Sequence, residues 1–194
     1  KVIRQELFST PLWRTTLPSF IDVEWIRDLA LEQRGASPKL NDCGGWQSHT
    51  SGNAMQYVLP IPSGLELQEF LDTEMNNIAQ ELKLQQINLL NYWVNVNPPG
   101  SYNEVHKHSN SLLVGNLYLQ VPKNSGDIKF IRNDENDYFT SKYETSNNPV
   151  MSAKQTITPV ENEIYIFPGW LQHGVTLNTS TSDRISFSFN YGVI

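Results

Sequence analysis

The chain has 194 residues, of which 39% are hydrophobic and 18% are charged, so we expect one globular domain with a sizeable core. The net charge of −6 does not favour binding to nucleic acid or to an anionic membrane. No apolar run approaches the roughly 20 residues that a membrane-spanning helix needs. The single cysteine, Cys43, excludes an intramolecular disulfide, and the first residues lack an apolar signal segment. Both features predict a cytoplasmic protein.

Two segments in the first part of the chain are predicted to be helices. Phe20 to Gln33 carries apolar residues near a helical period. Ser63 to Leu82 begins with a residue suited to cap a helix and carries its apolar residues in one stripe. Residues 1–86 are therefore expected to form a helical support for the rest of a single domain.

From residue 87 onward the pattern changes to short strand-like runs separated by Pro, Gly, Asn and Ser. These runs cover residues 87–96, 111–121, 126–132, 156–160, 163–168, 173–178 and 184–193. They predict a mainly β core over residues 87–194, either a sandwich or a barrel, flanked by the N-terminal helices. The long polar stretch 133–156 is predicted to be an insertion, of the kind that serves as a lid or is mobile.

Two of the four histidines, His106 and His108, are separated by one residue just before an apolar run. Residues i and i+2 of a strand point the same way, so the two imidazoles would converge if the segment is extended. Imidazole is a common metal ligand, and the pair would supply two nitrogens. The alternative is a pair of surface histidines without a role.

A third histidine, His173, strengthens the metal interpretation. If the polar residues 178–183 form a hairpin loop, His173 lies opposite Ser188, and His173, Arg184 and Ser186 share one face of the sheet. That face is either solvated or lines a polar pocket with a metal at its floor. An arginine with a nearby hydroxyl is a good receptor for a carboxylate, because guanidinium binds carboxylate through two parallel hydrogen bonds.

The order of these residues resembles the Fe(II)- and 2-oxoglutarate-dependent oxygenases, and in particular a bacterial and phage subgroup of them. The resemblance covers about residues 87–194 and includes the H-x-H pair, the distal histidine and the R-x-S motif. Further matching motifs are GGWQS at 44–48, W-x-N-x-N-x-x-G at 93–100, YL-x-VP at 118–122 and P-x-W-x-x-H-x-V at 168–175. The combination is far more specific than any single motif.

The resemblance implies a double-stranded β-helix, that is, a cupin-like jelly roll, with a metal near one mouth. It implies an enzyme that uses Fe(II) as cofactor and 2-oxoglutarate as cosubstrate, and that hydroxylates a substrate while releasing succinate and carbon dioxide. His106 and His173 would bind iron. Arg184, helped by Ser186, would pair with the distal carboxylate of the cosubstrate. The further residues that would contact the cosubstrate are Tyr118, Asn95 and Asn116.

The chain departs from the family pattern at His108, where most of these enzymes have a carboxylate. His108 is the favoured third ligand because its spacing fits. The alternatives are a carboxylate from elsewhere, such as Glu104 or Asp127, or a position left open for an anion. Two rival functions follow from this departure: a three-histidine dioxygenase that does not use 2-oxoglutarate, and a non-catalytic binding module. The R-x-S motif at Arg184 argues against the first rival, which needs no carboxylate receptor.

The substrate is a small molecule or a peptide that the sequence does not identify. Trp46, Gln47 and Trp170 are predicted to wall its cavity, and core packing is the alternative for the two tryptophans. A homodimer is one expected assembly.

Overall fold

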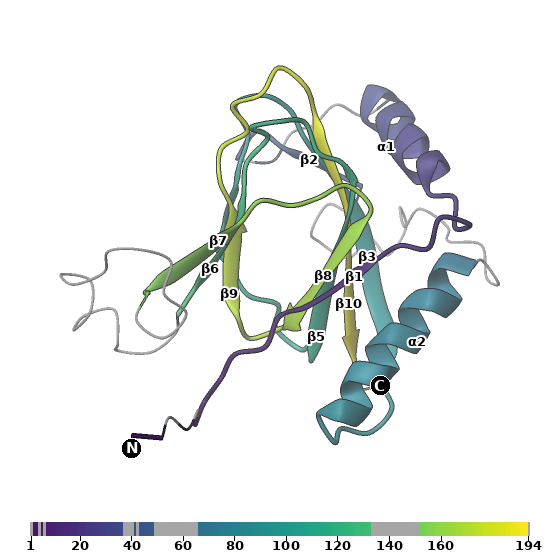
Figure 1. The fold of residues 1–194 in the computed structure, drawn as a ribbon. Helices are drawn as coiled ribbons and strands as arrows, with labels where there is room; N and C mark the ends of the chain where they lie inside the picture. The colour runs from purple at the N-terminus through teal and green to yellow at the C-terminus, as the bar shows by residue number, and fades with distance from the viewer. Residues whose placement is uncertain are drawn as a thin grey trace.

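The structure is a computed structural model that describes residues 2, 3, 5, 7–36, 41, 43–48, 66–132 and 152–193. It contains two helices and ten strands (Figure 1). The helices are α1 (Glu24–Ala36) and α2 (Glu66–Glu81). The strands are β1 (Trp13–Thr16), β2 (Trp46–Gln47), β3 (Asn88–Asn97), β4 (Asn103–His106), β5 (Leu113–Gln120), β6 (Ile128–Ile131), β7 (Lys154–Ile157), β8 (Glu163–Pro168), β9 (Gln172–Val175) and β10 (Arg184–Gly192). Most of the polar stretch 133–156 and the predicted cap Ser63 lie outside the described residues.

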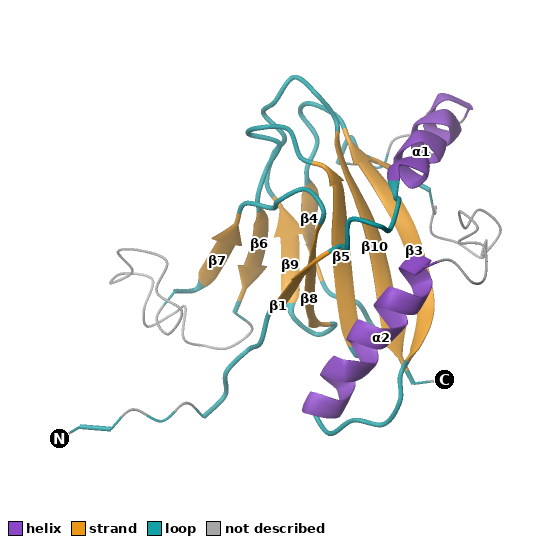
Figure 2. Ribbon diagram, turned by 45° about the vertical axis from the view of Figure 1, so that its right-hand side comes forward, coloured by secondary structure: helices purple, strands orange, loops and turns teal. Residues whose placement is uncertain are grey.

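The strands form two antiparallel sheets that face each other (Figure 2). The larger sheet has the order β1-β8-β5-β10-β3-β2, and the smaller has the order β4-β9-β6-β7. Strands that are neighbours in the sheets are often distant in the sequence, as expected when a β-sandwich is built from crossing connections. This arrangement confirms the mainly β jelly roll that the sequence predicts. The predicted helices are also present, although each differs from its expected bounds by a few residues.

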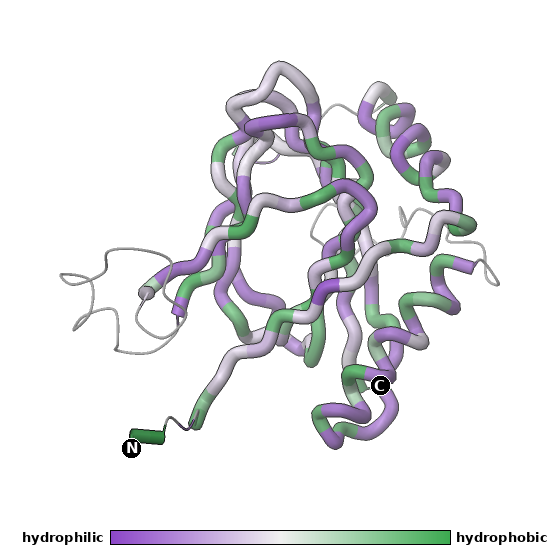
Figure 3. Tube along the Cα trace, viewed as in Figure 1, coloured by the Kyte–Doolittle hydropathy of each residue, from purple (hydrophilic) through white to green (hydrophobic). Residues whose placement is uncertain are grey.

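Both helices lie on the outer face of the larger sheet (Figures 1 and 2). Hydrophobic and hydrophilic residues alternate along them (Figure 3), as expected for helices with one buried face. The backbone amide of Glu24 donates to the carboxylate of Asp22 at 2.9 Å, which caps the start of α1. The side chain of Asn76 in α2 donates to the carbonyl of Ile87 and accepts from its amide, at 3.1 and 3.0 Å. These two bonds tie α2 to the start of β3.

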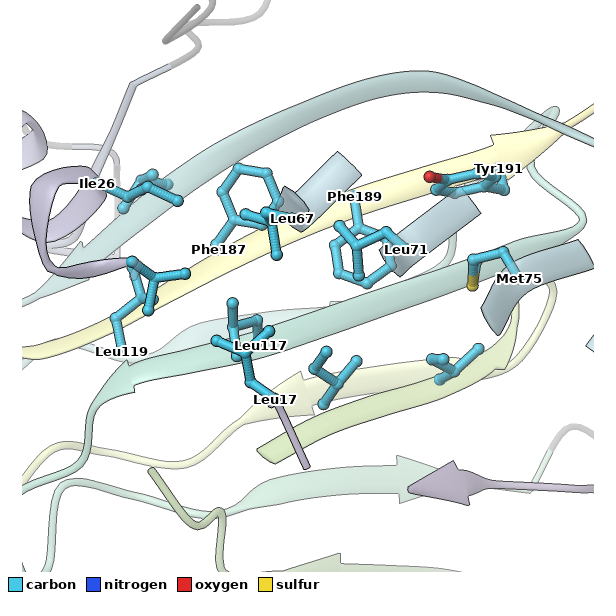
Figure 4. Close-up of a cluster of buried hydrophobic side chains, with 14 of the residues drawn as sticks. Leu17, Ile26, Leu67, Leu71, Met75, Leu117, Leu119, Phe187, Phe189 and Tyr191 are labelled. Atoms are coloured by element: carbon cyan, nitrogen blue, oxygen red, sulfur yellow. The ribbon is translucent and has the colours of Figure 1, made fainter. Parts of the chain in front are cut away.

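Strand β10 lies in the middle of the larger sheet and is buried along its whole length. Its alternate residues Ile185, Phe187, Phe189 and Tyr191 belong to the apolar core beneath the helices. Figure 4 shows the three aromatic side chains facing Leu67, Leu71 and Met75 of α2. The remaining residues of β10, including Arg184, point toward the smaller sheet. The two-residue alternation of the sequence therefore predicts both faces of β10 correctly.

The predicted hairpin between β9 and β10 is wrong. His173 lies opposite His106 of β4 and Phe130 of β6, not opposite Ser188. Strand β10 pairs instead with β3 and β5 in the other sheet. The reason is that the polar segment 178–183 crosses from one sheet to the other. His173 and Arg184 therefore approach the same interior space from opposite sheets.

Candidate active site

Three histidines converge where strands β4 and β9 meet. His106 and His173 are cross-strand neighbours, and their ring centroids are 4.5 Å apart. His108 follows β4, and its ring centroid lies 5.1 Å from each of the other two. One ring nitrogen from each residue lies within 4.8 Å of the others, a spacing that can hold a metal ion. We call His106, His108 and His173 the three-histidine cluster.

Backbone carbonyls fix the orientation of two rings in the three-histidine cluster. Nδ1 of His106 lies 2.8 Å from the carbonyl oxygen of Glu104, and Nδ1 of His173 lies 2.8 Å from that of Leu171. A carbonyl oxygen can only accept a hydrogen bond, so each Nδ1 carries the proton. The lone pair of each Nε2 is then available to a metal. Histidine ligands of metals are commonly oriented in this way through the other ring nitrogen.

The third ring, His108, is held by different means. It stacks on the indole of Trp93, with ring centroids 5.7 Å apart and planes 18° apart. Its backbone amide donates to the carbonyl of Gly169 at 2.9 Å. Its Nε2 is buried and has no hydrogen-bond partner in the protein. A buried polar atom without a partner is costly, so this nitrogen needs either a metal or an acceptor for its proton.

Burial keeps two of the imidazoles neutral. Burial, with smaller contributions from His106 and His108, lowers the pKa of His173 to about 3, while the hydrogen bond to the carbonyl of Leu171 opposes this change. Burial, followed by the charge on His106, lowers the pKa of His108 to about 4. Neutral imidazole keeps the lone pair that a metal needs. The donor set therefore fits iron(II), for which imidazole is a suitable ligand.

Among the described residues, no carboxylate joins the three-histidine cluster. Glu104 is exposed, and it reaches the site only through its carbonyl oxygen, which His106 engages. Asp127 accepts a hydrogen bond from Thr158 at 2.8 Å instead. Glu104 and Asp127 were the alternatives for the third ligand, and neither lies in the cluster, whereas His108 does.

Arg184 lies at the start of β10 and is 1% exposed. Its guanidinium donates to the carbonyl of Ser125 at 2.8 Å and to the side-chain oxygen of Asn103 at 3.4 Å. No described acidic side chain forms an ion pair with it, although Asp127 is near enough to act on its charge. Burial lowers the pKa of Arg184, while Tyr118 and Asp127 oppose that change. A buried cation without a paired anion is unfavourable unless a ligand supplies the anion.

The inward face of the larger sheet carries a hydrogen-bonded network next to Arg184. We call Gln47, Asn95, Asn116, Ser186 and Ser188 the inner polar network. The amide oxygen of Asn95 accepts from Gln47 at 2.8 Å and from the indole of Trp93 at 3.1 Å. Its amide nitrogen donates to the hydroxyls of Ser188 at 2.9 Å and Ser186 at 3.4 Å. Ser188 in turn donates to Asn116 at 2.6 Å.

The sequence comparison that decides the family covers most of the β core. Residues 91–190 match the family model described as "Putative 2OG-Fe(II) oxygenase". The matched region includes the three-histidine cluster, Arg184 and Ser186. The chain belongs to the 2OG-Fe(II) oxygenase family.

Solved structures with a similar fold agree with this assignment. A prolyl-4-hydroxylase from Pseudomonas putida matches with 17% identity and a TM-score of 0.58, over 93% of this chain and 92% of that one. HygX from Streptomyces hygroscopicus, solved with nickel and 2-oxoglutarate bound, matches with 12% identity and a TM-score of 0.59, over 95% and 83% of the chains. The viral collagen prolyl hydroxylase of Paramecium Bursaria Chlorella virus-1, in its 2-oxoglutarate complex, matches with 12% identity and a TM-score of 0.58, over 94% and 96%. No curated protein sequence matches the chain.

As a 2OG-Fe(II) oxygenase, the chain is a dioxygenase that uses Fe(II) and 2-oxoglutarate. The non-catalytic alternative is thereby set aside. No helix in the described part of the chain is long and apolar enough to span a membrane.

The structure places the predicted cosubstrate residues of this oxygenase on the inward face. Tyr118 is buried and lies opposite Ser186 across the β5–β10 pair. Burial raises the pKa of Tyr118 well above its ordinary value, so its hydroxyl is protonated and can donate. Asn95 makes two donor and two acceptor bonds within the protein, one of them to Ser186. Its contact with the cosubstrate stays a prediction.

The predicted substrate residues separate into two groups. Trp170 is 53% exposed and follows Gly169, whose carbonyl contacts His108, so it lies at the rim of the site. Gln47 lies in the inner polar network. Trp46 is 5% exposed and belongs to the apolar core under the helices, so the structure places it on the opposite face from the substrate side.

Sequence reasoning missed several residues that shape the site. Asn103 and Ser125 hold Arg184, Trp93 stacks on His108, and Asn190 lies on the inward face of β10 and raises the pKa of His108. Asn103 and Ser125 lie outside any recognised motif. Trp93 begins the W-x-N-x-N-x-x-G motif, yet core packing is the more common role of such a residue. Asn190 is the next inward residue after Ser188, and this alternation was the one available signal for it.

Proposed function

We propose that this oxygenase hydroxylates a small-molecule or peptide substrate with conversion of 2-oxoglutarate to succinate and carbon dioxide. The observation that carries the proposal is the buried Arg184, which has no acidic partner among the described residues and lies on the face that is directed toward the three-histidine cluster. A dicarboxylate that reaches from the cluster to Arg184 would supply the missing negative charge.

Each residue of the site has a distinct role in this proposal. His106, His108 and His173 hold the iron through one ring nitrogen each. Arg184 binds the distal carboxylate, and its fixed contacts with Ser125 and Asn103 orient the guanidinium in advance. The hydroxyls of Ser186 and Tyr118 are placed to donate to the same carboxylate. The bound iron and cosubstrate supply the oxidising chemistry that uses dioxygen.

Aromatic rings shield the His173 side of the cluster from water, whereas His106 is exposed. Phe167 packs edge-on against His173 with ring centroids 4.6 Å apart, and Phe130 lies 6.4 Å away. Exclusion of water strengthens the electrostatic contacts of the site and protects reactive species. Trp170 at the open rim is available for contact with the substrate.

A direct test does not require the substrate. The iron-loaded protein is incubated in air with 2-oxoglutarate labelled at the carboxyl carbon next to the keto group, and labelled carbon dioxide is collected. We expect slow release from the parent protein, and none above background from His173→Ala. Arg184→Met is expected to need a higher cosubstrate concentration for the same rate.

Two results would contradict the proposal. Equal cosubstrate dependence in Arg184→Met and parent would show that Arg184 does not bind 2-oxoglutarate. Binding of 2-oxoglutarate and iron without any release of label, together with oxygen uptake, would favour a three-histidine dioxygenase that does not consume the cosubstrate. The absence of a carboxylate from the described cluster is the observation that supports this second function.

A further inference from the structure

Backbone carbonyls orient two rings of the three-histidine cluster, but not the third. His106 and His173 are oriented by carbonyls two residues earlier in their own segments. No backbone carbonyl in the described part of the chain does this for His108, and its buried Nε2 has no hydrogen-bond partner. A neutral imidazole that binds a metal through one nitrogen carries its proton on the other, and that N–H needs an acceptor.

Asn190 of β10 offers such an acceptor. It is 7% exposed, and its register partner Asn91 lies two residues along β3 from Trp93, the residue that stacks on His108. The side chain of Asn190 also raises the pKa of His108, as a nearby hydrogen-bonding group does. Its amide nitrogen donates to the side-chain oxygen of Asn91 at 2.7 Å, across the β10–β3 register pair that these residues form. In this arrangement the amide oxygen is the end of Asn190 that does not bond to Asn91. The oxygen, Oδ1, is buried and has no hydrogen-bond partner in the protein.

We propose that Asn190, oriented by Asn91, is a positioning residue that accepts the N–H of His108 and turns the other ring nitrogen toward the metal. Trp93 confines the same ring from its face, and its own indole is held by Asn95. Strand β10 thereby supplies an orienting contact for His108, which stands where most of these enzymes have a carboxylate. The inference rests on the proposed metal site.

The test measures metal affinity and not turnover. Cobalt(II), which prefers similar nitrogen ligands and gives visible absorption bands, is titrated into the metal-free protein. Four proteins are compared: parent, Asn190→Leu, His108→Ala and the double variant. Loss of an orienting contact typically weakens metal affinity by about 10- to 100-fold, which is the loss we expect for Asn190→Leu. The cobalt bands of that variant should also change in shape.

The double variant separates positioning from a general structural effect. If Asn190 acts through His108, adding Asn190→Leu to His108→Ala should change cobalt affinity by less than about twofold. Ser182→Ala is the control, because Ser182 is exposed and lies in the connection before β10, outside both sheets. It should leave cobalt affinity and spectrum unchanged. If Asn190→Leu does not fold, as judged by thermal melting without metal, Asn190→Ala takes its place.

The possible results are distinguishable. If His108→Ala weakens cobalt binding but Asn190→Leu does not, the positioning role is wrong and the metal site stands. An equal loss from Asn190→Leu in both backgrounds would also refute positioning through His108. If His108→Ala itself leaves cobalt affinity unchanged, His108 is not a ligand, and both the third-ligand assignment and this inference fail.

Discussion

The two faces of strand β10 differ in chemistry although both are buried. The outward face consists of Ile185, Phe187, Phe189 and Tyr191, each 0% exposed. The inward face consists of Arg184, Ser186, Ser188 and Asn190, each 7% exposed or less. The outward residues pack against the helices, whereas the inward residues face the space between the two sheets. Equal burial therefore has different consequences on the two sides.

Burial of the outward face stabilises the fold, because removing apolar surface from water is favourable. Burial of the inward face costs free energy unless every polar group has a partner. The serines and Asn95 have such partners, while the amide oxygen of Asn190 and the charge of Arg184 are incompletely satisfied. Because these groups are costly to bury, we infer that the inward face serves binding.

Replacing His173 should have the largest effect on function. His173→Ala removes a buried ligand from the three-histidine cluster and is expected to abolish detectable iron binding. The metal-free protein should still fold, because the imidazole is not part of the apolar core beneath the helices. Calorimetric titration with iron(II) under nitrogen measures the first result, and circular dichroism the second. Parent-like iron affinity would refute the metal site.

Phe189 should matter most for stability. Its ring lies directly over Gly115 of β5, where an added Cβ would be 2.2 Å from two ring carbons. We expect Phe189→Ala to lower the free energy of unfolding by about 3–5 kcal/mol. Urea unfolding measures this loss. The affinity of the folded variant for 2-oxoglutarate should stay near that of the parent. A large drop in this affinity would show that the outward face also contributes to cosubstrate binding.

Replacing Arg184 should weaken cosubstrate binding without lowering stability, which is the reverse of the effect expected for Phe189→Ala. Arg184→Met is expected to weaken 2-oxoglutarate binding by about 1.5–3 kcal/mol, the usual value of a hydrogen bond to a charged group. The stability of the ligand-free protein should stay the same or rise, because a buried charge without an acidic partner is removed. Paired titration and urea unfolding give both quantities. A variant that lost stability but kept its cosubstrate affinity would assign Arg184 to the fold and not to the site.

Ser188 should give the smallest effect. Its hydroxyl links Asn95 to Asn116 in the inner polar network. Ser188→Ala leaves these two amides without one partner each and should lower the free energy of unfolding by about 1–3 kcal/mol. Urea unfolding measures it, with Ser182→Ala at an exposed turn as the control. No measurable loss would indicate that water replaces the hydroxyl.

Much of the fold can be predicted from local patterns. The alternation in RISFSFNYG separates the two faces of β10, and the apolar stripes locate α1 and α2. The pairing of β9 could not be predicted in this way, because consecutive strands usually pair with each other. Here, residues 178–183 cross to the opposite sheet, and nothing in their composition distinguishes a crossing from a hairpin loop.

The site was predictable to the extent that its residues stand in motifs. His106, His108, His173 and Arg184 do so, and the structure brings the three histidines together. Trp46 and Gln47 are adjacent in sequence but lie on opposite faces of the sheet, which follows only once β2 is known to be a strand. The proposed contact of Asn190 with His108 depends on how the turn after β4 folds back, and that is a property of the tertiary structure.

The most direct test of the central claim, that the inward face and the three-histidine cluster together hold iron and 2-oxoglutarate, is a visible absorption spectrum recorded without oxygen. Iron(II) and then 2-oxoglutarate are added to the metal-free protein. We predict the charge-transfer band of a keto acid chelated to iron, absent in His173→Ala and shifted to higher cosubstrate concentration in Arg184→Met. A protein that binds iron but shows no band at any 2-oxoglutarate concentration would contradict the claim.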